Sequence, residues 1–347
     1  MFIRPDEMVL VTGAAGFIGP SVVRILLQRG FPNLRLLLRS YGRSAAIKEI
    51  VSSQKDARIE IFQGDLLSPE DCAGAAKDVS LVYHLAMGSG EKSFGHLFLN
   101  SVVTTRNLLD ACVRQRCLKR FVNVSSFAVY TNCEKPLGKI LDESCPVEQD
   151  PVRRWDAYCF AKIKQDETVI EYGRKHAMPY VIVRPGVVYG PGRNGITGRV
   201  GIGTFGVFLH LGGPNQVPLT YVDNCADAIV LAGLSEGADG EVFNVVDDDL
   251  PSSRKLLQLY KKNVKRFRSV YIPRAVSYLL SCIWEDYSHW SRGQLPPAFN
   301  RKTWHAYWKG SKYSNAKMKH LGWTPHISTA DGLSRYFQSC RGEEQHA

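Results

Sequence analysis

Long hydrophobic runs and CxxC cysteine pairs are absent from this sequence of 347 residues. No apolar run approaches the roughly 20 residues that a transmembrane helix needs. The first residues, MFIRPDE, contain no apolar segment followed by a cleavage site, which argues against a secretory signal. The 9 cysteines have no histidines at metal-ligand spacing, so we expect reduced thiols, no metal site and a cytoplasmic location.

The overall composition is not extreme, but the charged residues are unevenly distributed along the chain. Hydrophobic residues make up 44% and charged residues 22%, ordinary values that exclude a disordered or fibrous chain. Residues 251–347 hold 17 Lys and Arg against 5 Asp and Glu, whereas residues 1–250 are nearly neutral. Such a basic end suits solvent, an anionic ligand or an acidic membrane surface. Without a helix-turn-helix or an aromatic–basic motif, we expect no nucleic-acid partner.

Short apolar runs alternate with helical patterns along the first 250 residues. Apolar strands separated by helices are typical of a parallel sheet covered on both faces, so the sequence predicts a doubly wound, Rossmann-type α/β fold. Helices are expected at Pro20–Arg29 and Ser101–Arg114, and turns or linkers at the glycine-rich 190–203 and 212–218. The expected strands are Met8–Thr12, Leu34–Leu38, Ile59–Gln63, Leu81–His84, Phe121–Val124, Tyr180–Arg184 and Glu241–Val246.

A loop with regularly spaced glycines follows the first strand. Glycines permit a tight turn and let the backbone approach a phosphate, while the free N–H groups at a helix start attract anions. The strand before and the helix after are the context that this motif requires. The sequence therefore predicts that Gly13, Gly16, Phe17, Ile18 and Gly19 hold the pyrophosphate of a dinucleotide.

The second strand ends at an arginine, Arg39, with Arg43 nearby. An NAD site usually has an acidic residue at this point, which accepts hydrogen bonds from the ribose hydroxyl. A guanidinium instead suits the 2′-phosphate of NADP, because it can form paired hydrogen bonds with it. The sequence favours NADP over NAD. The alternative is that Arg39 stacks on the adenine of NAD.

A tyrosine and a lysine, Tyr158 and Lys162, form a YxxxK pair. Their spacing of four places them on one helix face. The pKa of a tyrosine is about 10, and nearby positive charges, from the ammonium and a nicotinamide ring, lower it. Tyr158 can then exchange a proton with a substrate hydroxyl. Upstream, the strand Phe121–Val124 ends in the hydroxyl residues Ser125 and Ser126.

Together these motifs resemble the extended short-chain dehydrogenases/reductases, the NAD-dependent epimerase/dehydratase family. The resemblance covers nearly the whole chain, because RPGVVYGPG at 184–192, YVDN at 221–224 and LGWTP at 321–325 follow in family order. It implies that Ser126 completes a catalytic set with Tyr158 and Lys162, the last two also contacting the cofactor. It further implies a homodimer formed by the helices Ser101–Arg114 and Ala157–Tyr172.

The resemblance also implies further cofactor contacts at strand ends. His84 precedes one of these segments and is expected to be packed rather than catalytic. The implied contacts are Asp65 and Leu66 on the adenine side, Leu85 and Ala86 along the cofactor, and Pro185 and Val188 beside the nicotinamide.

The sequence departs from the family pattern in two places, and the second restricts the class of reaction that we expect. Asn100 stands one position before the family's asparagine, so its role stays open. Phe127 and Ala128 occupy the positions of the Asp-Glu pair of the dehydratase branch. Elimination of water needs such carboxyl groups, so we expect no 4,6-dehydratase.

The sequence is compatible with two classes of small-molecule substrate. In both, hydride is transferred at a secondary alcohol or ketone. The favoured class is a nucleotide sugar, on which the enzyme would act as oxidoreductase or epimerase and whose diphosphate suits Arg193, Arg199 or Lys312. The alternative is an apolar alcohol, as in 3β-hydroxysteroid dehydrogenases and dihydroflavonol reductases. A catalytically silent dinucleotide-sensing protein is a third reading, which the intact YxxxK pair disfavours.

The chain is expected to divide into two parts. Residues 1–190 with 220–250 would form the NAD(P)-binding Rossmann domain, and 191–219 with 251–347 a smaller, mostly helical substrate-binding lobe. Within this lobe, apolar residues from Val270 to Trp284 follow the basic run KKNVKRFR. The favoured interpretation is that they form core, and the alternative is peripheral contact with an anionic membrane.

Overall fold

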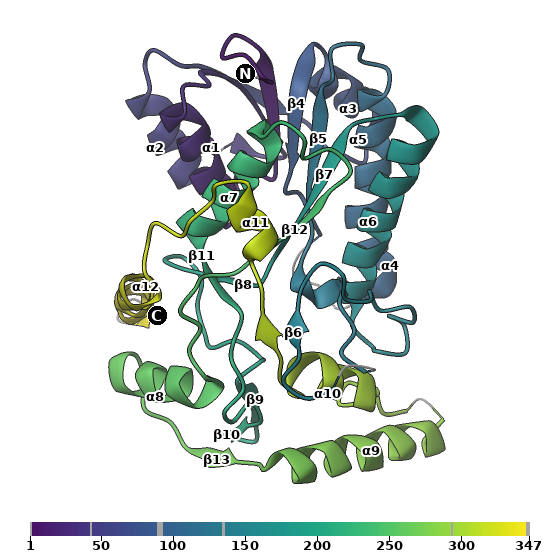
Figure 1. Cartoon of the computed structure of the whole chain (residues 1–347), viewed down its shortest axis with the longest axis vertical. Coiled ribbons are helices and arrows are strands. Elements are labelled where there is room, and N and C mark those ends of the chain that lie inside the picture. Colours follow the sequence, from purple (N-terminus) through teal and green to yellow (C-terminus); the bar gives the residue numbers. More distant parts are fainter. Residues whose placement is uncertain (1, 42–43, 89–92, 134–135, 293, 345–347) are drawn as a thin grey trace.

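The computed structural model describes residues 2–41, 44–88, 93–133, 136–292 and 294–344 (Figure 1). Arg43 lies outside the described residues. A large sheet with helices on both sides fills the upper part of Figure 1, and shorter strands and helices form the lower part.

The large sheet has seven strands in the order β12-β7-β5-β4-β1-β2-β3, and all neighbouring pairs are parallel. The chain therefore proceeds outward in both directions from β1 and β4, which confirms the doubly wound Rossmann-type prediction. Each predicted strand agrees with the observed one to within two residues at either end. The strands are β1 (Met8–Thr12), β2 (Asn33–Leu38), β3 (Arg58–Gln63), β4 (Val79–His84), β5 (Arg120–Val124), β7 (Tyr180–Pro185) and β12 (Val242–Val245).

Helices cover both faces because strand residues alternate in direction. Val9 of β1 packs in one cluster with Val22, whereas the adjacent Leu10 packs in another with Leu108. The first face carries α1 (Gly19–Gln28), α2 (Ala45–Ser53) and α7 (Val222–Leu234), and the second carries α3 (Pro69–Ala76), α5 (Thr104–Cys112) and α6 (Ala157–His176) (Figure 1).

The helix predicted at Ser101–Arg114 has different bounds. It begins at Phe94 as α4 (Phe94–Leu97), because the Ser93 side chain caps that end, and it continues through a π-helix, η2 (Phe98–Val103), into α5. A π-helical turn accommodates an extra residue, and Asn100 lies within it, which matches its one-residue offset in the sequence.

The lower part combines short strands with helices, and after residue 250 it is mostly helical, as predicted. The prediction of turns throughout residues 190–203 was wrong for residues 201–203, because the first strand of a hairpin begins at Gly201. The 3-10 helix η3 (Phe127–Val129) follows β5 and precedes the first short strand of the lower part. The remaining elements are β6 (Ile140–Leu141), β8 (Val187–Tyr189), β9 (Gly201–Thr204), β10 (Val207–His210), β11 (Leu219–Tyr221), α8 (Ser253–Asn263), β13 (Ser269–Tyr271), α9 (Arg274–Trp290), α10 (Arg301–Tyr307), β14 (Lys312–Tyr313), α11 (Ala316–His320) and α12 (Thr329–Glu344).

Apart from Ile272, which packs against a small core cluster, the large apolar residues from Val270 to Trp284 are exposed, so the favoured interpretation of this stretch as core was wrong. Leu279, Leu280 and Ile283 are exposed, because α9 turns its serines inward against α10. Among the described residues, no helix has the length and apolarity needed to cross a bilayer.

Candidate active site

The glycine loop joins β1 to α1 at the carboxyl end of the sheet. Gly13 has a φ of 70°, and a Cβ atom there would lie 2.7 Å from the backbone nitrogen of Ala86. A Cβ atom at Gly19 would clash with the backbone of Ala14. No side chain caps the start of α1. The loop is therefore a backbone cradle at a helix N-terminus, which fits a pyrophosphate.

The predicted adenine-side residues lie at the ends of the neighbouring strands β2 and β3. Arg39 directly follows β2, is exposed, and makes no hydrogen bond or ion pair within the described part of the chain. After β3, the Asp65 carboxylate accepts from the backbone nitrogen of Leu67 at 2.9 Å, and Asn107 donates to the Leu66 carbonyl at 3.0 Å. Arg39 is thus free to meet a ligand, whereas Asp65 is fixed by its turn.

The segment after β4 lies against the glycine loop. The backbone nitrogen of Leu85 donates to the Thr12 carbonyl at 3.2 Å, and that of Ala86 to the Thr12 hydroxyl at 3.4 Å. His84 is buried, with its ring nitrogens 2.8 Å from the hydroxyls of Thr12 and Thr105. Burial lowers the pKa of His84 to about 3. The packed position predicted for this histidine is confirmed.

The three predicted catalytic residues meet at the end of β5. Asp156 caps α6, and Tyr158 follows in the first turn. The Ser126 hydroxyl accepts from the backbone nitrogen of Ala128 at 3.1 Å and lies close enough to the Tyr158 hydroxyl to lower its pKa. One turn further along α6, Lys162 is buried and its Nζ donates to the Val124 carbonyl at 2.7 Å.

Burial controls the protonation of this pair. Desolvation of the hydroxyl raises the pKa of Tyr158, and the Ser126 hydroxyl and the positive charge of Arg193 oppose that shift. Burial lowers the pKa of Lys162 to about 8, against the negative charge of Asp166. The Tyr158 hydroxyl therefore holds its proton at neutral pH, and a further positive charge beside it would ease the release of that proton.

A buried network behind Lys162 was not predicted. The Asp166 carboxylate accepts from Arg184 at 3.0 Å, from Ser125 at 2.8 Å and from Asn123 at 2.9 Å. Burial raises the pKa of Asp166, whereas Arg184 opposes that shift. The resemblance placed the segment that begins with Arg184 beside the nicotinamide, but the guanidinium lies buried against Asp166. The sequence signal for Asp166 was its spacing of four from Lys162, which places both residues on one face of α6.

Of the three basic residues suggested for a diphosphate, Arg193 alone lies beside the loop and the catalytic pair. Its guanidinium lies 5.6 Å from the centre of the Phe17 ring, and its charge acts on Tyr158. Arg199 is buried and donates to the Ala306 carbonyl at 3.1 Å, and Lys312 is exposed on β14.

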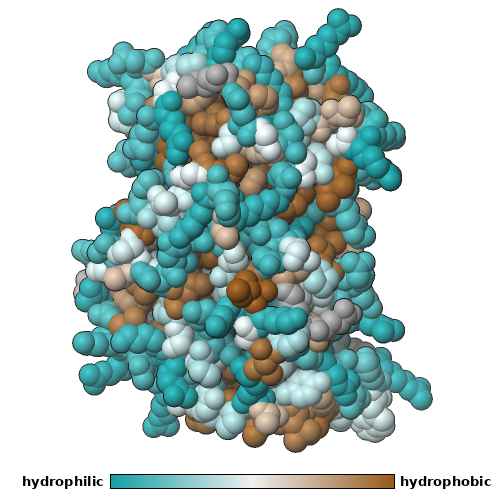
Figure 2. All heavy atoms as spheres, viewed as in Figure 1, coloured by the Kyte–Doolittle hydropathy of each residue, from teal (hydrophilic) through white to brown (hydrophobic). Residues whose placement is uncertain are grey.

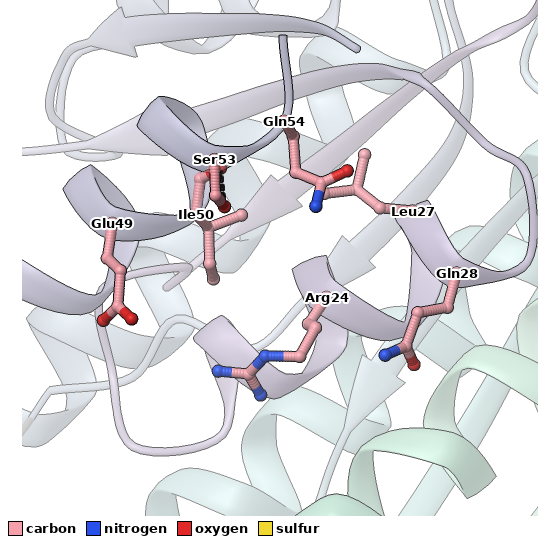
Figure 3. Close-up of a pocket in the computed structure, with 7 residues that line it drawn as sticks. All are labelled: Arg24, Leu27, Gln28, Glu49, Ile50, Ser53 and Gln54. Carbon is pink, nitrogen blue, oxygen red and sulfur yellow. Dashed lines mark hydrogen bonds between the residues drawn. The ribbon is translucent and has the colours of Figure 1, made fainter. Parts of the chain in front are cut away.

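One hollow of the structure is lined by predicted site residues, and a second is not. A cavity of about 270 Å³ between β8, the segment 193–198, α8 and α12 is lined in part by Val188 and Arg193. Pro185 ends the nearby β7 and is buried. A second hollow lies between α1 and α2 and contains no predicted site residue; its side chains come from both helices (Figure 3).

Comparison with curated proteins gives relatives with several activities. The chain is 30% identical over 187 residues to cinnamoyl-CoA reductase 1 of Oryza sativa subsp. japonica, which covers 53% of this chain and 54% of the relative. It is 25% identical over 254 residues to the decarboxylating sterol-4-alpha-carboxylate 3-dehydrogenase of Mus musculus, covering 69% and 64%. A trifunctional UDP-glucose 4,6-dehydratase, epimerase and reductase of Arabidopsis thaliana is 26% identical, covering 68% and 36%. The chain thus spans about half or less of the length of some of these relatives.

Solved structures share the fold. The UDP-glucuronic acid 4-epimerase of Bacillus cereus, solved with UDP-glucuronic acid and NAD, has a TM-score of 0.72 at 21% identity, covering 97% of this chain and 100% of that one. The UDP-glucose 4-epimerase of Thermus thermophilus, solved with NAD, has a TM-score of 0.69 at 22% identity, covering 97% and 99%. Residues 9–245 match the family model, and the chain belongs to the NAD dependent epimerase/dehydratase family.

Proposed function

We propose that the protein is an NAD(P)-dependent oxidoreductase or epimerase that transfers hydride at a secondary alcohol or ketone of a nucleotide sugar. The observation that carries this proposal is the convergence of three side chains after β5: Ser126 acts on the Tyr158 hydroxyl, and Lys162, one helical turn from Tyr158, donates to the Val124 carbonyl. The proposal assigns the cofactor to the sheet part, residues 1–190 with 220–250, and the substrate to residues 191–219 with 251–347.

The residues present fit a nicotinamide dinucleotide. The cradle formed by Gly13 and Gly19 leaves no room for a Cβ atom, and the start of α1 carries no side-chain cap. When bound, the cofactor supplies hydride chemistry. We assign its binding to Gly13, Gly16, Phe17, Ile18, Gly19, Arg39, Asp65, Leu66, Leu85, Ala86, Tyr158, Lys162, Pro185 and Val188.

Side chains of the protein would transfer the proton and orient the reacting oxygen of the substrate. Ser126 orients the substrate oxygen toward Tyr158 by hydrogen bonding. Tyr158 gives a proton to that oxygen in reduction and accepts one in oxidation. Lys162 holds positive charge behind the pair, and its bond to the Val124 carbonyl fixes its position.

A nucleotide sugar is favoured by Arg193. This exposed guanidinium lies beside Phe17 of the loop, where a substrate diphosphate could pair with it. The curated relatives that act on cinnamoyl-CoA and on a sterol favour the second candidate, an apolar alcohol or carbonyl substrate.

The experiment is a substrate panel with each dinucleotide. Purified protein is incubated with UDP-sugars, sterols and aryl thioesters, while nicotinamide absorbance and product mass are followed. We expect turnover of a UDP-sugar, with no product lighter by one water because Phe127 and Ala128 replace the carboxyl pair. Turnover of a sterol or thioester alone would select the second candidate. Dinucleotide binding without any turnover would favour the silent sensor.

The cofactor preference is expected to depend on Arg39. Charge-assisted hydrogen bonds contribute about 1.5–3 kcal/mol, so Arg39→Asp should weaken NADP binding by roughly 10-fold or more. It should leave or improve NAD binding. Titration of both dinucleotides measures this, with Arg58→Asp on the exposed start of β3 as the matched charge change. Equal binding of NAD and NADP by the unaltered protein would contradict the preference.

The assembly is expected to be a homodimer through α6 and the continuous helix of η2 and α5, which contains the predicted Ser101–Arg114. Ile170 on α6 and Phe98 and Leu99 on η2 are exposed, and the two helices lie side by side. Leu99→Glu with Ile170→Glu should therefore convert a dimer to a monomer in sedimentation, because each buried charge would lack a partner. Leu279→Glu on α9 should leave the dimer intact. A monomeric unaltered protein at micromolar concentration would refute this assembly.

A further inference from the structure

Helix α9 presents its apolar side chains outward. Its buried residues are Ser277, Ser281 and Ser288, and the Ser277 hydroxyl accepts from Trp304 Nε1 at 2.9 Å. Surface helices normally have the reverse arrangement. Leu279 is 59% exposed, Ile283 56% and Trp290 77%. The outward stripe comprises Val276, Leu279, Leu280, Ile283, Tyr287 and Trp290.

Neighbouring elements extend this stripe. Val270 and Tyr271 on β13 are exposed, and Phe205 at the turn between β9 and β10 is fully exposed with a φ of 47°. The strands β13, β10 and β9 form one sheet. Figure 1 places this sheet and α9 at the lower end, where Figure 2 shows hydrophobic side chains between hydrophilic ones. We call these residues, with the stripe, the α9 face.

The surroundings of the α9 face are positively charged. The connection from α8 to β13 carries exposed Lys265, Arg266 and Arg268, and Arg292 follows α9. The two acidic residues of α9 share one arginine, which offsets one of their two charges: Arg301 lies 3.3 Å from Glu285 and 2.9 Å from Asp286. An apolar and aromatic centre thus has a basic margin.

We propose that the α9 face binds the surface of a membrane that contains anionic phospholipids. Leu and Ile side chains would enter the acyl boundary, and Trp and Tyr would lie at headgroup depth. The basic margin would meet the lipid phosphates, each cation contributing about 1 kcal/mol, or roughly fivefold in affinity. A second copy is a poorer occupant, because a two-fold contact would bring two basic margins together. The helix would lie on the bilayer and not cross it.

The test is co-sedimentation of the full-length protein with vesicles. We compare phosphatidylcholine alone with phosphatidylcholine plus phosphatidylglycerol, each at low and high salt. Binding is expected on the anionic vesicles and should weaken as salt rises. Leu279→Glu with Ile283→Glu should reduce binding at least about 10-fold per side chain, because each buried aliphatic group contributes about 1.5–3 kcal/mol. Arg266→Glu with Arg268→Glu should reduce it without altering the apolar stripe.

Controls separate this surface from general stickiness. Leu137→Glu replaces another exposed leucine outside the α9 face and should bind as the unaltered protein does. Melting temperatures should stay unchanged in the variants, because the altered side chains contact solvent. No binding to anionic vesicles, or equal binding by the Leu279→Glu, Ile283→Glu protein, would overturn the proposal. Self-association that this double variant abolishes, without vesicle binding, would assign the face to a second copy.

Discussion

Tyr158→Phe is expected to retain the fold and dinucleotide affinity but to lose turnover by about 10²–10⁴-fold. The substitution removes the transferable proton and keeps the ring. Tyr158 is 41% exposed although its hydroxyl is desolvated, so its ring does not support the core. Melting temperature, dinucleotide titration and steady-state rates on one identified substrate measure the three expectations.

Tyr172→Phe on the same helix is the matched control. Its hydroxyl bonds to Asp110 at 2.6 Å, away from the catalytic set. This variant should keep nearly full turnover, because it loses a hydroxyl that takes no part in the reaction. Turnover within a few-fold of normal by Tyr158→Phe would remove this tyrosine from its proposed role.

Asp166→Asn is expected to have the largest effect on stability. It leaves the buried Arg184 without its counter-charge, and breaking such a pair costs about 3–5 kcal/mol of unfolding free energy. It also removes the negative charge that raises the pKa of Lys162. That pKa, about 8 in the intact protein, should fall further, so Lys162 would lose its proton at lower pH. The alkaline limb of the pH–rate profile should therefore move to lower pH.

Glu167→Gln, one residue further along α6, provides the comparison. This exposed carboxylate pairs with Lys164, and exposed pairs contribute little. Denaturant unfolding and pH–rate profiles of both variants separate the two effects. A destabilised Asp166→Asn with an unmoved alkaline limb would make Asp166 structural only, and equal stability of the two variants would refute the buried-pair argument.

The sheet and the catalytic set were predictable because their signals are local. Runs such as Val9–Val11 favour strands wherever they stand, and the glycines at 13 and 19 are required by a close backbone approach that the structure shows. The spacing of Tyr158 and Lys162 fixed their common helix face. The position of Ser126 came from the family resemblance, and the structure places it where it lowers the pKa of Tyr158.

Other features depend on packing partners that are distant in sequence. The spacing of Asp166 indicates its helix face, but only the fold shows that Arg184 lies opposite. Arg193 lowers the pKa of Tyr158 by its charge and comes from a glycine-rich loop with no periodic pattern. An apolar stripe such as that of α9 has the same spacing whether it is buried or exposed, so periodicity could not decide between core and surface.

The measurement that tests the central claim most directly follows deuterium placed on the substrate carbon that carries the secondary hydroxyl. Unaltered protein should move the label to the nicotinamide ring in a net oxidation, or return it to the same carbon in an epimer of unchanged mass. Tyr158→Phe should transfer it at least about 100-fold more slowly. Label released to water, a product lighter by one water, or equal transfer by Tyr158→Phe would contradict hydride transfer assisted by Tyr158.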